Sequence, residues 1–579
     1  MMIDGEGAAP ASALADAHDV PTRDGTGDAA WGRNGALASA LFLAACGSEQ
    51  AGTSATPAGS STPAPTPVTV APPAPPTAAE ASRFLAQSSM GATRAEIDKV
   101  VSRGYAGWID DQIAMARPTS YWGWLVAGGY NVAANSNSYA GFDAMVWSQL
   151  IGAPDQLRQR VTTALLDILV VGIDGLNAQW RPFLMAAYMD VLADNAFGNY
   201  RTLLGAVTTS AAMAYYLTYL NNRKADARTG AMPDENYARE LMQLFTLGLY
   251  RLNNDGTQQT SNGAPIDTYT QADVTQLARV FTGLQLANND NSSPDRMRLP
   301  LVMTASLHES GTSTVLGASI NGADGMGAVN AALDTIFAHP NVPPFIGKLL
   351  IQRLVTSNPS PAYVARVAAV FADNGKQVRG DLAAVVRAVL LDSEARGSAA
   401  LTRAQAGRLR TPVERLTGWA RAFGATSPSN AWAIGDTTSG TSRLGQGIGR
   451  APSVFNFYRP GYIPPATALA SAGLVAPEFQ ITNEQSVVGY VNFMYSLVAN
   501  GIGDVKADYT AILTKAGDSA ALVDEVNVLL AAGQLSSATV ASIRAAVDSV
   551  ATTATNAAIN RVGIAIMLTL ASPDYLTLR

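Results

Sequence analysis

The polar residues best placed to do chemistry lie in the segment PDENYARELMQLFTLGLY, which runs from Pro233 to Tyr250. At 3.6 residues per turn, this segment predicts one helix that is apolar on nearly every side. One stripe on it is polar and consists of Asn236, Arg239, Glu240 and Gln243. Because so apolar a helix should be mostly buried, and buried charges need partners, we expect Arg239 and Glu240 to form an internal polar network.

This stripe has two interpretations. In the structural one, which we favour, it holds a neighbouring helix through Arg279 or Gln271 and sets the register between the two helices. In the functional one, it lines a polar pocket that binds a ligand or performs acid–base chemistry, with Glu240 as a catalytic carboxylate.

Further candidates for acid–base chemistry follow along the chain. Asp273 is one, although it also suits the N3 position of a capping box opened by Thr270. His308 and Glu309 stand together in a loop rich in Gly, Ser and Thr, where a histidine can act as acid, base or ligand, or merely form a local hydrogen bond. Two carboxylates drawn from Glu240, Asp273 and Glu309 would suit glycoside hydrolysis if they were about 5 to 10 Å apart.

A second group of candidates lies in the stretch GQGIGRAPSVFNFYRPGYIPP, within an irregular region over residues 425–482. Its cationic and aromatic side chains suit acidic or sugar ligands. The candidate binding residues are Arg450, Phe455, Tyr458, Arg459 and Tyr462. We expect this loop to meet the loop around His308 in one cleft, because long ordered loops often carry function. The alternative is that both loops wrap the core with their aromatic side chains packed inward.

The composition of the chain argues against several classes of protein. The net charge is −6 over 579 residues and the basic residues are scattered, so the basic stripe of a nucleic-acid-binding protein is missing. Three histidines and one cysteine are too few for a convincing zinc centre, and no G-x-S-x-G sequence occurs. We therefore assign no cofactor, no metal ligand and no nucleic-acid partner, while calcium or magnesium on carboxylates stays open.

These candidate side chains must be positioned by helices. From about residue 80 onward, apolar residues recur at helical spacing in segment after segment, and alternating strand patterns are scarce. We therefore predict a mainly α, multi-helical globular body with long irregular loops and a small β-hairpin within residues 285–325. The body is assigned to residues 80–482, and a C-terminal helical segment over residues 483–579 is expected to pack on it.

The only cysteine, Cys46, ends the sequence Leu-Ala-Ala-Cys after a short apolar run. This pattern resembles a bacterial lipoprotein signal, in which the chain is cleaved before the cysteine and the cysteine is acylated. We interpret residues 1–45 as a signal region with a misassigned start, and residues 46–79, rich in Ala, Thr, Pro and Ser, as an extended tether. Since Gly47 and Ser48 include no retention aspartate, the resemblance points to a lipid anchor in the cell envelope, at the outer membrane.

Several segments, taken in order, resemble the bacterial family called domain of unknown function 1800. They cover roughly residues 80–480 and include SRFLAQSSMGATRAEIDKV, ENYARELMQLFTLGLY, YTQADVTQLARVFTG, HESGTSTVLG, FIGKLLIQRLV and GQGIGRAPSVFNFYRPGYIPP. Gln243 departs from the family pattern, which usually has glutamate there, and Leu284 stands where an aromatic residue is common. The resemblance implies a secreted or envelope-associated helical protein, often encoded beside a partner of the domain of unknown function 1501 family. It assigns no catalytic residue.

Two functions are compatible with these observations. The first is a non-catalytic envelope lipoprotein whose helical body binds a partner protein or a surface polymer. The second is an extracytoplasmic hydrolase that acts on polysaccharide through a carboxylate pair, with His308 nearby. The two differ in geometry, because a hydrolase needs those side chains to converge on an open cleft.

Overall fold

Helices form most of the structure, as the spacing of apolar residues predicts. The computed structural model describes residues 74–579, which belong to one unit over Pro73–Arg579. Cys46 and most of the predicted tether lie outside the described residues. Over the described range the fold consists of helices α1 to α24 and four two-stranded antiparallel sheets. The predicted mainly α fold class is therefore confirmed.

The helices that precede the candidate segment are α1 (Ala78–Ser88), α2 (Arg94–Ala114), α3 (Tyr121–Ala127), α4 (Phe142–Trp147), α5 (Gln156–Leu166), α6 (Arg181–Asp194), α7 (Tyr200–Thr208) and α8 (Ala211–Tyr216). The central helices are α9 (Asn236–Gln243), α10 (Gln271–Val280), α11 (Gly325–Ala338), α12 (Val342–Leu354), α13 (Pro361–Ala372), α14 (Leu382–Leu391), α15 (Ser393–Arg396) and α16 (Ala399–Thr402). The last group is α17 (Pro412–Ala422), α18 (Ala468–Ser471), α19 (Glu484–Asn500), α20 (Thr510–Leu513), α21 (Ser519–Ala531), α22 (Ser537–Asp548), α23 (Ala557–Ala571) and α24 (Pro573–Leu576).

The strands are β1 (Thr260–Ser261), β2 (Ala264–Pro265), β3 (Leu284–Gln285), β4 (Val302–Met303), β5 (Ser313–Val315), β6 (Ala318–Ile320), β7 (Arg408–Leu409) and β8 (Thr577–Leu578). Short helical turns η1 to η5 occupy Ala133–Asn135, Ser148–Gly152, Ile173–Gly175, Asp295–Arg298 and Pro477–Ile481.

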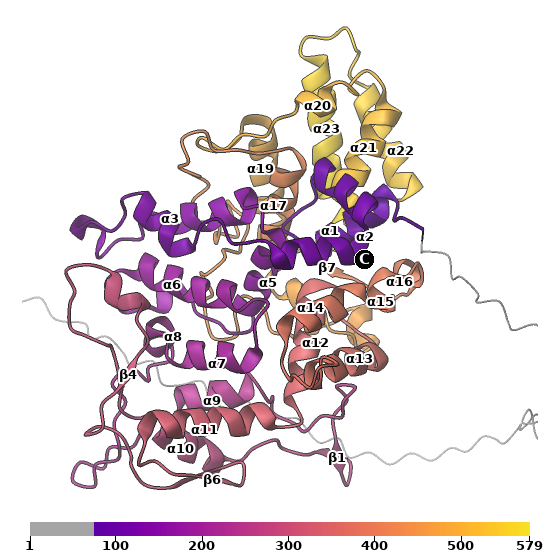
Figure 1. The fold of residues 1–579 in the computed structure, drawn as a ribbon. Coiled ribbons are helices and arrows are strands. Elements are labelled where there is room, and N and C mark those ends of the chain that lie inside the picture. Colours follow the sequence, from indigo (N-terminus) through magenta and orange to yellow (C-terminus); the bar gives the residue numbers. More distant parts are fainter. Residues whose placement is uncertain (1–73) are drawn as a thin grey trace, which may run out of the picture. The chain divides into compact units, whose positions relative to one another are not determined.

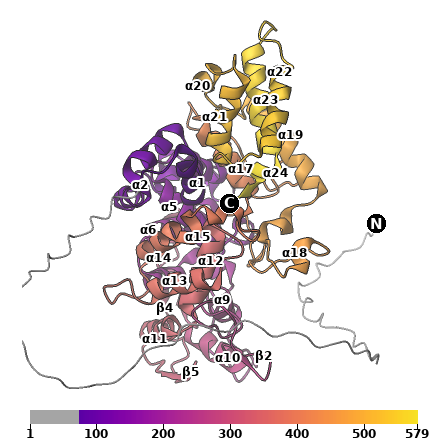
Figure 2. The ribbon, with the colours of Figure 1, turned by 90° about the vertical axis from the view of Figure 1, so that its right-hand side faces the viewer.

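The helices are grouped along the unit. Helices α9, α10 and α11 lie together at one end, and α20 to α23 lie at the opposite end (Figures 1 and 2). Between them, α12 packs against α13, α14 and α5. Strand β8 pairs with β7, with Arg408 opposite Leu578, so the end of the chain is joined to the middle of the fold. None of the described helices combines the length and the apolar character needed to cross a bilayer.

The central candidate segment is shorter as a helix than predicted. We expected one helix from Pro233 to Tyr250, but α9 ends at Gln243. The reason lies at Gly248, which adopts φ +75°, and a Cβ there would meet the ring of Phe345 at 2.8 Å. The amides of Leu247 and Gly248 both donate back to the carbonyl of Met242, so the chain turns away from the helix axis instead of continuing along it.

Two local predictions are confirmed. Strands β5 and β6 form the small hairpin, joined by Leu316 at φ +49° and Gly317 at φ +80°, which is the positive-φ pair of a two-residue turn. The capping box at the start of α10 is complete, since the Thr270 hydroxyl accepts from the amide of Asp273 and the Asp273 carboxylate accepts from that of Thr270.

Candidate functional site

Two adjoining cavities of the described structure form one groove. One has a volume of about 550 Å³ and the other of about 700 Å³. They share residues 248–250, Phe345 and Leu349 of α12, and Pro460 and Gly461. Because a common set of residues lines both, we treat them as one surface, named here the α12 groove.

One face of α12 forms the floor of this groove. The five residues that line it follow helical spacing and cover an arc of about 140° at 100° per residue. They are Phe345, Lys348, Leu349, Gln352 and Arg353. The remaining face carries Ile346, Leu350 and Leu354, which are fully buried. The helix thus packs into the core with its apolar face and presents to the groove a mixed face of two apolar and three polar residues, two of them cationic.

The first wall is the irregular segment that follows α9. It contributes residues 247–250, Leu252, Gly256 and Gln258. The buried side chain of Asn341, at the start of α12, fixes this segment: its amide nitrogen donates to the carbonyls of Leu247 (2.9 Å) and Tyr250 (2.8 Å), and its oxygen accepts from the amide of Leu252 (3.0 Å). One side chain therefore ties the wall to the floor.

The second wall is the aromatic loop that the sequence analysis selected. Phe455, Arg459 and Tyr462, three of the binding candidates, line the groove. Asn456 anchors the loop, because its side-chain amide donates to Asp167 at 2.6 Å. The backbone amide of Arg459 donates to Gln480 at 2.8 Å. These two hydrogen bonds hold an irregular segment in place beside α12.

Arg353 and Asp167 lie at the deep side of the groove. The Arg353 side chain is only 5% exposed, its Nε has no hydrogen-bond partner, and the nearest carboxylate oxygen, on Asp167, is 3.9 Å away. The guanidinium lies over the ring of Tyr458 at 4.6 Å. Burial raises the pKa of Asp167, although Arg353 and Asn456 act in the opposite direction. Arg353 is thus a buried cation with an incomplete set of partners.

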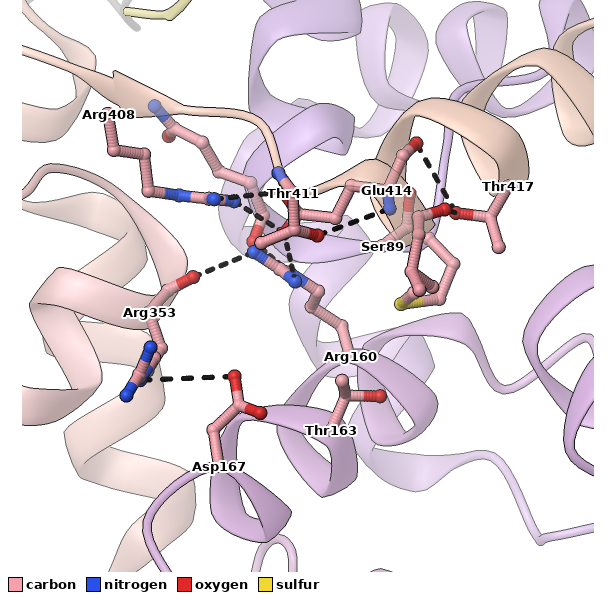
Figure 3. A network of polar contacts seen from close by, with 12 residues as sticks. Ser89, Arg160, Thr163, Asp167, Arg353, Arg408, Thr411, Glu414 and Thr417 are labelled. Carbon is pink, nitrogen blue, oxygen red and sulfur yellow. Dashed lines mark hydrogen bonds and ion pairs between the residues drawn. The ribbon is translucent and has the colours of Figure 1, made fainter. Parts of the chain in front are cut away.

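A buried ionic network lies beneath the floor (Figure 3). Glu414, at N3 of α17, accepts two hydrogen bonds from Arg408, at 2.6 and 2.8 Å, and forms an ion pair with Arg160. Arg160 in turn donates to the carbonyl of Arg353 at 2.8 Å. Burial opposes the charge on Glu414, but Arg160 and Arg408 outweigh it and hold its pKa at about 2. The network therefore connects α5 with α17 through ionised side chains and with α12 through a backbone carbonyl.

The predicted network around Arg239 and Glu240 is formed only in part: Arg239 does join α10, donating to the side chain of Gln271 at 3.1 Å, but Glu240 takes no part. Arg239 is 39% exposed on its side chain and pairs with Glu235 at 3.0 Å, one turn earlier on the surface. Glu240 is buried and its Oε2 has no partner, so burial raises its pKa to about 6. The prediction of a buried network was wrong because Asn236 and Arg239 lie on the solvent side of α9, whereas Glu240 points into the core.

The other two members of that predicted network have separate environments. Gln243 lines the groove and accepts a hydrogen bond from Tyr269 at 3.3 Å. Arg279 bonds to Gln276 on its own helix and approaches Glu309 at 3.7 Å. Neither contacts Arg239, so the stripe is divided among the surface, the core and the groove.

The remaining catalytic candidates have structural partners and line neither cavity of the groove. Asp273 uses one oxygen for the Thr270 cap and the other to accept from the amide of Leu316 at 2.7 Å. His308 is 3% exposed, and its ring nitrogens approach the carbonyls of Thr282 (2.8 Å) and Gly322 (3.0 Å). The expected cleft between the His308 loop and the aromatic loop is therefore wrong: His308 is sealed against the end of α10.

Two of the five binding candidates are also buried. Arg450 forms a bidentate pair with Asp143, with both bonds at 2.9 Å, and lies within 4 Å of Asp174 and Asp436. Tyr458 is 2% exposed and packs beneath Arg353. Both side chains support the aromatic loop from inside instead of facing a ligand.

Sequence reasoning missed the floor of the groove. The segment FIGKLLIQRLV was recognised as a helix, but its polar residues Lys348, Gln352 and Arg353 were not considered. Their spacing could have predicted a binding surface, because three polar residues share one face of an otherwise apolar helix. Such a face is too polar for the core and too apolar for an ordinary solvent-exposed surface. Asp167, at the end of α5, carried no such signal.

Comparisons with known proteins agree with the resemblance found in the sequence. Neither the curated proteins nor the solved structures include a match to this chain. One family model does match, over residues 83–577, and so extends through the C-terminal helices beyond the segments that carried the resemblance. The chain belongs to the family described as protein of unknown function (DUF1800).

Proposed function

We propose that the helical body is a non-catalytic binding unit that holds an extended surface polymer in the α12 groove. Four aromatic residues line this groove: Tyr250, Phe345, Phe455 and Tyr462. Rings of this kind stack on the flat faces of sugars, and the amide side chains of Gln243 and Gln258 match sugar hydroxyls as donors and acceptors. Each cavity alone has the size of a small-ligand site, about 300–1,000 Å³, so the two together suit a chain of several units.

The observation that carries this proposal over hydrolysis is the number of carboxylates. Asp167 is the only acidic residue among the described residues that line the two cavities. Hydrolysis of a glycosidic bond ordinarily needs two carboxylates on either side of the bond. The groove offers one, already bonded to Asn456, and this favours binding without cleavage.

The cellular setting remains part of the proposal. We propose that Cys46 is acylated and that the tether holds the body at the cell envelope, at the outer membrane. A partner protein of the domain of unknown function 1501 family remains a prediction, and the residues that line the groove argue neither for it nor against it.

The proposal is tested with the full-length protein and a panel of surface polysaccharides in affinity electrophoresis. We expect at least one polymer to retard the protein, and Phe455→Ala and Tyr462→Ala to weaken that retardation. Tyr495→Ala is the matched control, because Tyr495 is 66% exposed on α19 and lines neither cavity. Unchanged retardation in both groove variants, or none with any polymer, would contradict the proposal.

A further inference from the structure

The charge of the α12 groove differs from that of the chain. The chain as a whole carries −6, whereas the residues lining the groove include three cations, Lys348, Arg353 and Arg459, against the single carboxylate of Asp167. Among the described residues, neither Lys348 nor Arg459 has an acidic partner within 4.0 Å, and Arg353 has one only at 3.9 Å. The groove is therefore a cationic site in an acidic protein.

Two of these cations are partly or almost fully buried, and for Lys348 an unpaired charge is unfavourable. Lys348 is half-buried, and burial lowers its pKa with no carboxylate to offset the effect. Arg353 is almost fully buried, and its Nε has no partner. The small cavity below Arg353 has room for about one water molecule, so a larger group can approach only from the groove. A ligand anion would supply the missing partner.

The cations are also distributed along the groove. Lys348 and Arg353 are five residues apart on α12, which separates their Cα atoms by about 7.5 Å along the axis at 1.5 Å per residue. Arg459 stands on the opposite wall, where its guanidinium lies over the ring of Phe455 at 4.5 Å. Cations placed on the floor and on the wall in this way suit a polymer with repeated anionic groups better than a single small anion. The aromatic lining then favours sugar rings between those groups.

We infer that the ligand of the α12 groove is an acidic polysaccharide, whose anionic groups bind Lys348, Arg353 and Arg459. This inference rests on the proposed function and adds the charge of the polymer to it. Arg353 binds the most deeply placed group, since it is the cation that the aromatic loop and α12 enclose together. Lys348 and Arg459 bind groups nearer to solvent, so their contribution weakens as the salt concentration rises.

The test compares polymers that share a backbone and differ in charge. Binding of the full-length protein to polygalacturonate and to its fully methyl-esterified form is measured by isothermal titration calorimetry, with dextran sulfate and polyglutamate as further ligands. We expect the acid form to bind at least about tenfold more tightly than the ester, the scale of one charged hydrogen bond, and high salt to reduce the difference. Tight binding of dextran sulfate as well identifies the recognised group as any polysaccharide anion, not the carboxylate alone.

Variants then assign the effect to the three cations. Lys348→Gln and Arg459→Gln should each weaken binding of the acid form about tenfold and weaken binding of the ester much less. Lys376→Gln and Arg228→Gln are the matched controls, since both side chains are exposed and line neither cavity. Arg353→Lys, which keeps the charge, should retain more acid binding than Arg353→Gln, with circular dichroism confirming that both variants are folded.

The outcomes separate this inference from the proposed function. Equal binding of the acid and the ester would overturn the inference and leave the groove as a neutral polymer site. Polyglutamate binding as tightly as polygalacturonate would overturn the assignment to a polysaccharide. If Lys348→Gln and Arg459→Gln both bind the acid form like the wild type, the groove cations do not recognise it. Binding of no polymer at all overturns the proposed function together with the inference.

Discussion

Replacing Glu414 by glutamine tests the buried network most directly. The side chain is 12% exposed and is shared by two arginines, Arg160 and Arg408. Glutamine keeps the shape but removes the charge, so both guanidinium groups would be left in the core without their counter-charge. Removing one partner of a buried ion pair costs about 3–5 kcal/mol. The Glu414→Gln variant should therefore lose a large fraction of a typical folding stability of about 5–15 kcal/mol.

The pKa of Glu414 gives a second, independent estimate of its contribution to the free energy of unfolding. Its value of about 2 in the folded protein lies below the ordinary value of 4.5. A depressed carboxyl pKa stabilises the folded state above the unfolded pKa, and this stabilisation is lost as the pH falls from about 4.5 to 2. The shift corresponds to about 3 kcal/mol at pH 7, which agrees with the estimate from the lost charge.

The assay is urea unfolding of the wild type and of Glu414→Gln between pH 3 and pH 8, followed by circular dichroism. The difference in free energy of unfolding should be about 3 kcal/mol at pH 7 and fall to about half by pH 3. Asp295→Asn is the control, because it removes one charge of the exposed Arg298–Asp295 pair and should change stability by less than about 1 kcal/mol. Equal stability of Glu414→Gln and the wild type at pH 7 would refute the reasoning.

Three further substitutions have definite expectations. Asn341→Ala removes the hydrogen bonds to Leu247, Tyr250 and Leu252 and should lower the free energy of unfolding by about 2–4 kcal/mol. Amide hydrogen exchange should become faster over residues 247–252. Faster exchange confined to other segments would contradict the role assigned to Asn341. Burial raises the pKa of Glu478 to about 7. The stabilisation that its neutral carboxyl group contributes is present below about pH 4.5 and is lost as the pH rises through 7. Glu478→Gln should therefore stabilise the protein at pH 8 but not at pH 4. Glu240→Gln should behave in the same way around pH 6, and a lower melting temperature of this variant at pH 8 would restore the network that we first predicted.

The sequence predicted elements well where the signal was local. The capping box of Thr270 and Asp273 and the small hairpin within residues 285–325 depend on a few neighbouring residues, and both formed as expected. The end of α9 did not, because it depends on the close approach of Phe345 to Gly248, about a hundred residues away in the chain. An apolar pattern cannot distinguish a helix that continues from one that turns where another element blocks its path.

The candidate site was predicted in part for the same reason. Phe455, Arg459 and Tyr462 were selected by residue type as binding candidates, and they line the groove. Arg450 and Tyr458, selected by the same criterion, are buried by partners from distant segments: Asp143 in one case and Arg353 in the other. His308 was selected as a loop residue, and the loop proved to be packed against the end of α10.

The buried network and the groove have one explanation in common. A buried ion pair is often no more stabilising than an apolar contact of the same volume, so stability alone does not account for Glu414 between two arginines. Arg160, held by Glu414, donates to the backbone carbonyl of Arg353 at 2.8 Å and so fixes the turn of α12 that carries the deepest cation of the groove. Tyr458 supports the same guanidinium from below. A cation fixed before the ligand arrives loses little conformational entropy on binding. The network is therefore best understood as the part of the fold that positions Arg353 at the floor of the groove.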